Sequence, residues 1–205
     1  MVGICYRRTA PGDSEVEFVS HEEVLDLFDD YGIDQVPQGE DRVYLRMNDA
    51  QGVVHIHLAC RETKCAPHKG ATVISVEKDR LPKVVEHIIH LLHLNQVLLF
   101  PVGKWRKVFD AVAFSLAQNE DWQAVDAAAT VELNSRDPLL CEPGDYHTLI
   151  ALIQALLGDA ETPDQGLMIV ATASPVLVEL IPDGAVRVSV GSQVLADEVT
   201  EAFAR

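Results

Sequence analysis

Apolar and polar residues alternate along two neighbouring segments, 43–47 and 53–58, and this alternation predicts two half-buried β-strands. In the second segment every other side chain is apolar, while His55 and His57 point together to the opposite face. The residues between the segments, 48–52, are mostly polar and end in glycine. Such a composition is typical of a hairpin connection, so we expect the two strands to pair with each other.

Other segments repeat apolar residues at helical spacing. The first predicted helix covers 22–31. Ser20 and Glu23 form a capping box at its start, and Gly32 ends it. Further helices are expected at 81–94, 103–116, 146–157 and 193–203.

Short apolar runs between these helices predict further strands. The run 96–102 is almost continuously apolar, which is the pattern of a strand covered on both faces. Other strands are expected at 2–6, 16–19, 71–76, 129–133, 167–171, 176–181 and 186–190. This mixture predicts an α/β fold, close to the α+β border, with a mixed sheet flanked by helices.

An internal similarity suggests how the chain is divided. The order strand, helix, strand over 71–102 returns over 129–171, and both stretches begin with Ala-Thr-Val. The polar residues 118–121 separate them. We therefore predict two similar α/β halves, 1–118 and 119–205, packed as one compact unit, with a chance likeness of two unrelated stretches as the alternative.

The densest chemistry in the chain is a group of five histidines and cysteines within fourteen positions, spaced H-x-H-x₂-C-x₄-C-x₂-H: His55, His57, Cys60, Cys65 and His68. Imidazole and thiolate are the ligands that zinc prefers. Four of the five would close a structural zinc site, whereas a catalytic site would keep one position open for water. The alternative is an ordinary sheet surface that carries two histidines and two cysteines.

A second candidate site lies at the predicted start of the helix after residue 103. Three cations, Lys104, Arg106 and Lys107, occupy its first turn, where the helix dipole disfavours positive charge. Free backbone N–H groups at a helix start can bind an anion, and these cations would strengthen such a site. The alternative is that they pair with the chain's many carboxylates.

Two weaker groupings complete the candidates. One helix face would carry a further set of metal-ligand types, Glu86, His90 and His93. A thiol and a base lie close in sequence at Cys141, Asp145 and His147, although a helix cap already accounts for the carboxylate. Neither a Walker A motif nor a G-x-G-x-x-G fingerprint is present.

The balance of acidic and basic residues indicates which class of binding partner to expect. Sixteen basic against thirty-two acidic residues give a net charge of −16, which disfavours nucleic acid and favours a protein partner with a basic surface. No apolar run approaches the roughly 18 to 20 residues that span a bilayer, so no membrane association is expected. The first residues lack the order of a secretion signal, and we expect a cytoplasmic protein with reduced cysteines.

These features favour a binding or regulatory protein without enzymatic activity, in which any zinc is structural. The alternative is a metal-dependent hydrolase that uses the histidine and cysteine group. Its small anionic substrate would be held by Lys104, Arg106 and Lys107.

Overall fold

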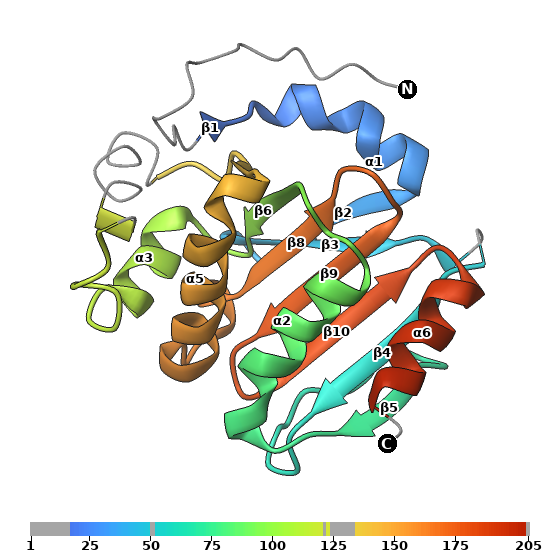
Figure 1. Ribbon diagram of the computed structural model, residues 1–205. Coiled ribbons are helices and arrows are strands. Elements are labelled where there is room, and N and C mark those ends of the chain that lie inside the picture. Colours follow the sequence, from blue (N-terminus) through green and yellow to red (C-terminus); the bar gives the residue numbers. More distant parts are fainter. Residues whose placement is uncertain (1–16, 50–51, 121, 124–133, 204–205) are drawn as a thin grey trace.

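The computed structural model describes residues 17–49, 52–120, 122–123 and 134–203, and within them it has an α/β fold. Its centre is an eight-stranded mixed sheet (Figure 1). The strands lie in the spatial order β1 (Glu17–Phe18), β7 (Leu139–Cys141), β6 (Val97–Pro101), β8 (Leu167–Ala171), β9 (Val176–Ile181), β10 (Ala185–Val190), β4 (Val54–Ala59) and β5 (Thr72–Ser75). Neighbouring strands are antiparallel except β4 and β5, which are parallel.

Four helices cover one face of this sheet, and we call this the helical face (Figure 1). They are α2 (Leu81–Leu91), α3 (Trp105–Val112), α5 (Tyr146–Asp159) and α6 (Gln193–Phe203). The larger apolar core lies between them and the sheet, and it includes Trp105, whose side chain is fully buried. The predicted helices are therefore confirmed in position, with ends that differ by a few residues.

The opposite face is only partly covered by apolar structure. Helix α1 (Leu25–Tyr31) and a two-stranded ribbon of β2 (Ile33–Gln38) and β3 (Arg42–Met47) pack over β6, β7 and β8. A second apolar core forms there. The predicted capping box at Ser20 and Glu23 is present, and it opens a short 3₁₀ turn that leads into α1.

The predicted hairpin between residues 43–47 and 53–58 is wrong. Strand β3 pairs with β2 in the ribbon, while β4 pairs with β10 and β5 in the main sheet. Alternation predicts a strand but does not choose its partner. The true partner β2 is mostly exposed and contains Pro37, so it lacks the apolar signature of a strand.

Strands from both predicted halves lie in the same sheet. The predicted strands at 2–6 and 129–133 lie outside the described residues, so the internal repeat stays a prediction. No helix within the described ranges is long and apolar enough to cross a membrane.

Candidate functional site

On the sheet face opposite the helices, the apolar side chains that pack under α1 and the ribbon give way to polar side chains on β9, β10 and β4. Three ionisable side chains lie side by side there: Glu179 on β9, Arg187 on β10 and His57 on β4. Strand register fixes this row, because Arg187 is opposite both Glu179 and His57. Glu179 and His57 are buried. Buried ionisable groups that gather at one place often mark a functional site.

Arg187 is held in place by its neighbours. Its Nη1 donates to Glu179 Oε2 at 3.0 Å, and both side chains of this ion pair are largely buried. Its Nη2 donates to the backbone oxygen of Ala66 at 2.6 Å and contacts Cys65 Sγ at 3.0 Å. Burial raises the pKa of Glu179, although the guanidinium opposes this shift. Arg187 therefore fastens the 60–70 loop onto the polar part of the sheet.

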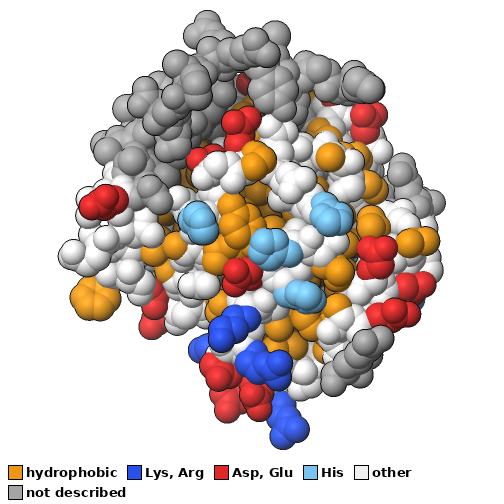
Figure 2. Space-filling view, in the orientation of Figure 1, with side chains coloured by type: hydrophobic (Ala, Val, Ile, Leu, Met, Phe, Trp, Pro, Cys, Tyr) orange, Lys and Arg blue, Asp and Glu red, His pale blue; other side chains and the backbone are white. Residues whose placement is uncertain are grey.

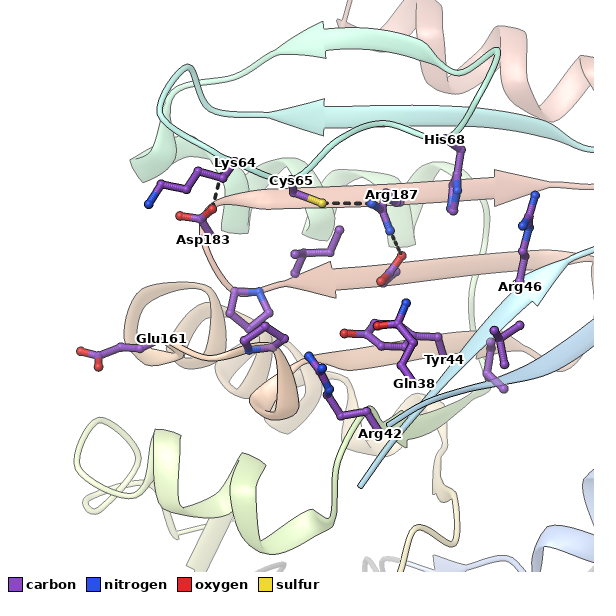
Figure 3. A pocket seen from close by; sticks show the side chains of 16 residues that line it. Gln38, Arg42, Tyr44, Arg46, Lys64, Cys65, His68, Glu161, Asp183 and Arg187 are labelled. Carbon is purple, nitrogen blue, oxygen red and sulfur yellow. Dashed lines mark hydrogen bonds and ion pairs between the residues drawn. The ribbon is translucent and has the colours of Figure 1, made fainter. Parts of the chain in front are cut away.

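A pocket of about 620 Å³ opens over this row, and Figure 3 shows its lining. We call it the arginine pocket. Its walls come from the β2–β3 ribbon, the 60–70 loop and the turns near residues 161–163 and 181–183. The charged side chains that line it are Arg42, Arg46, Lys64, Arg187, Glu161, Glu179 and Asp183.

Strand alternation brings the ribbon's polar side chains to this pocket. Arg42, Tyr44 and Arg46 are every second residue of β3, and all three line the cavity (Figure 3). Burial raises the pKa of Tyr44, and the nearby Arg42 acts in the opposite direction. Arg46 also lies 3.4 Å from Asp49 in an exposed pair, which contributes little to stability.

The predicted zinc ligands are only partly brought together. The rings of His55 and His68 lie 4.9 Å apart. His55 is also bonded on both nitrogens, from Nδ1 to Ser189 Oγ at 2.8 Å and from Nε2 to Asp49 Oδ1 at 2.9 Å. Ser189, His55 and Asp49 are therefore hydrogen-bonded in the order nucleophile, base and carboxylate, as in a catalytic triad. However, Ser189 is buried within β10 and does not line the pocket. These hydrogen bonds therefore anchor Asp49 and the segment after β3 to the main sheet.

The predicted ligands divide between two cavities. Cys65 and His68 line the arginine pocket, whereas Cys60 lines a cavity at the other side of the sheet, near α2 and α6. His57 is bonded to the backbone of Cys65, and burial together with Arg187 lowers its pKa. Across the described part of the chain, no three His, Cys, Asp or Glu side chains are arranged to hold a metal ion. The zinc site at His55, His57, Cys60, Cys65 and His68 stays a prediction from sequence.

The three cations of the predicted anion site at the start of α3 are not among the residues that line this pocket. Lys104 and Arg106 are exposed, and Lys107 Nζ lies 3.5 Å from Asp164 Oδ2. The N–H of Trp105 donates to the backbone oxygen of Ser135 at 3.3 Å. Lys107 is thus paired with a carboxylate of the same chain. Anion binding at the start of α3 stays a prediction.

Both weaker groupings belong to the helical side of the sheet, since α2 carries Glu86 and His90 and Cys141 lies in the larger core. Histidines gather on the helical face (Figure 2), and His90 Nε2 lies 2.5 Å from the hydroxyl of Tyr146. Cys141 belongs to the buried core, and burial raises the pKa of its thiol to about 12. A thiol with such a pKa is a poor nucleophile, and His147 is exposed.

Sequence reasoning missed most residues of the arginine pocket. A signal was available in the single charges that interrupt apolar strands, Glu179 in 176–181 and Arg187 in 185–190. Together the fold and the pocket define an α/β protein with a pocket on a sheet face that both basic and acidic side chains line. No protein-family model, curated protein or solved structure matches the chain.

We expect His68 to make the protein less stable in acid. Burial, helped by the charges of Arg187 and Arg46, lowers the pKa of His68 from 6.5 to about 4. The unfolded chain then takes up a proton first as the pH falls from 6.5 to 4, and stability is lost over that range. Urea midpoints at pH 7 and pH 5 should therefore differ more for the wild type than for His68→Gln. An equal drop in both proteins would contradict this account.

Proposed function

We propose that this cytoplasmic protein is a binding or regulatory protein that holds a small organic anion in the arginine pocket. One observation carries the proposal. Among the described residues, four lysines and arginines and three acidic residues line this pocket, an excess of one positive charge in a chain whose net charge is −16. An acidic protein that concentrates cations around a cavity favours a negatively charged ligand at that place.

The type of cation supports an anion with paired oxygens. Arginine presents a planar set of donors that match a carboxylate or a phosphate in two parallel hydrogen bonds. Glu179 is already bonded to Arg187, so it neutralises that one cation. Arg42 and Arg46, on the ribbon opposite, are the side chains that we expect to contact the ligand's charge.

The rest of the pocket suits an apolar body. Pro163, Ile181 and Pro182 also line it. The volume of about 620 Å³ lies within the roughly 300 to 1,000 Å³ of small-molecule sites. We therefore expect a ligand with an anionic head and an apolar portion of the size of a single ring.

Calorimetric titration with matched probes tests this proposal. Phenylacetate carries a carboxylate on an aromatic ring, phenyl phosphate carries a phosphate on the same ring, and phenylacetamide is a neutral analogue. At least one of the two anions should bind about tenfold more tightly than the amide, and which one binds better identifies the head group. Equal affinity for the anions and the amide, or no binding of any probe, would contradict the proposal.

The same titration also tests the alternative function, a metal-dependent hydrolase. A hydrolase for small anionic esters would release phenol from phenyl phosphate during the experiment, and added zinc would raise the rate if the reaction is metal-dependent. A basic protein partner would use the acidic outer surface instead of the pocket, so that expectation is independent and stays a prediction.

A further inference from the structure

The main sheet ends at β5, and among the described residues no strand pairs with its outer edge (Figure 1). On the inner edge, the N–H of Val76 donates to the backbone oxygen of Ala59, at the end of β4, at 3.0 Å. Backbone groups of successive residues point to opposite sides of a strand, so the N–H and C=O groups of Val73 and Ser75 point away from β4. We call this outward row of donors and acceptors the β5 edge. It is a template to which another strand can bond.

The other strand edges in the described ranges carry features that disfavour such pairing. β1, at the opposite end of the sheet, has only two residues. In the ribbon, β2 contains Pro37 and β3 carries Arg42 and Arg46. Short length, proline and charge are common means of protecting an edge. β5, with the sequence Thr-Val-Ile-Ser, has neither proline nor charge, so it is the least protected of these edges.

The side chains of β5 differ between its two faces. Ile74 packs against the larger core on the helical face. Val73 shares the opposite face with His57, its neighbour on β4, and is 58% exposed. The core therefore fixes the strand, while a β-branched apolar side chain lies exposed at its middle, where it can form a cross-strand pair.

We propose that the β5 edges of two copies of this chain pair antiparallel around a two-fold axis at Val73, which joins two main sheets into one. A two-fold interface needs a surface that is complementary to itself. The β5 edge meets this condition, because two opposite residues of an antiparallel pair exchange both N–H···O bonds, and Val73 points both groups outward. Val73 of one copy then lies directly opposite Val73 of the other, and the two apolar side chains contact each other.

Charge also favours a second copy at this edge. The net charge of −16 makes two copies repel each other in general. The stretch 69–83, which contains β5, is an exception with four basic and two acidic residues: Lys69, Lys78, Arg80 and Lys83, with Glu77 and Asp79. Antiparallel pairing brings the start of each β5 beside the end of the other, so Lys69 of one copy lies near Glu77 of the other. Repulsion is therefore reduced where the proposed contact forms.

Sedimentation velocity over a series of protein concentrations tests the pairing. Two four-residue strands form a small interface, so we expect a dimer with a dissociation constant of about 10 to 100 μM. Val73→Lys should raise this constant at least about tenfold, because it places like charges directly opposite each other at the two-fold axis. The matched control Val194→Lys changes another exposed valine, on α6, and should dimerise as the wild type does.

A second variant tests the backbone bonds and guards against a misfolded protein. Val73→Pro removes the outward N–H but no bond to β4, so the dimer should be lost while the fold persists. The urea midpoints of both Val73 variants, measured at a low concentration where the wild type is monomeric, should stay close to that of the wild type.

The possible outcomes decide the proposal. A wild type that remains monomeric throughout the series would overturn it. A dimer that persists unchanged in Val73→Lys and Val73→Pro, or one that Val194→Lys disrupts equally, would place the contact elsewhere and overturn it as well. The anion pocket is independent of these outcomes, because Val73 does not line it.

Discussion

Replacing Arg187 by leucine is expected to lower the free energy of unfolding by about 3 to 5 kcal/mol at neutral pH, the loss typical of breaking a buried ion pair. The substitution leaves the carboxylate of Glu179 buried without its partner. It also removes the bonds to Ala66 and Cys65 that fasten the 60–70 loop. Urea denaturation followed by circular dichroism measures the change.

Two further variants show whether the unpaired charge is the cause. Arg61→Leu removes an exposed arginine and should change stability by less than about 0.5 kcal/mol. The double variant Arg187→Met with Glu179→Leu removes both charges and should recover most of the loss, because apolar pairs often replace buried ion pairs without cost. A loss below about 1 kcal/mol for Arg187→Leu would show that this pair does not hold the site together.

The double variant Arg42→Gln with Arg46→Gln is expected to weaken the binding of phenylacetate about a hundredfold. Each arginine is expected to supply a hydrogen bond to the charged head, worth about 1.5 kcal/mol, and the two losses together give this factor. Both side chains lie on the ribbon, away from the buried row, so the fold should persist. Calorimetric titration measures the affinity, and the urea midpoint checks the fold.

The matched control is Lys104→Gln with Arg106→Gln, which removes the same amount of charge at the start of α3. This variant should bind phenylacetate as the wild type does. If instead it loses affinity while the ribbon variant keeps it, the anion site predicted from the sequence is the real one.

Hydrophobic periodicity predicts most elements of this fold because burial repeats along each helix and strand. The stripe of 105–112 packs into the larger core, and the continuous run of 97–101 is buried on both faces, with alternate side chains in the two cores. Partner choice is not encoded in this way. Strand β2, with Pro37 and a mostly exposed face, becomes a strand only because β3 pairs with it.

The candidate site was less predictable from the sequence. The sequence drew attention to His55, His57, Cys60, Cys65 and His68 because they are close along the chain. The fold places Cys60 at a different cavity and puts Cys65 and His68 in a pocket with Arg42, Arg46 and Arg187. Those arginines come from segments far apart in the chain, and the packing of the β2–β3 ribbon beside the main sheet brings them to one pocket. Local spacing contains no information about such a juxtaposition.

The most direct test of the anion pocket is to map the backbone amide shifts of the wild-type protein during a titration with phenylacetate. The account predicts that amides within 36–46 and 179–187, the segments that supply most of the pocket lining, shift together and saturate at one ligand per chain. Shifts confined to 103–107, or no saturable shifts at all, would contradict it.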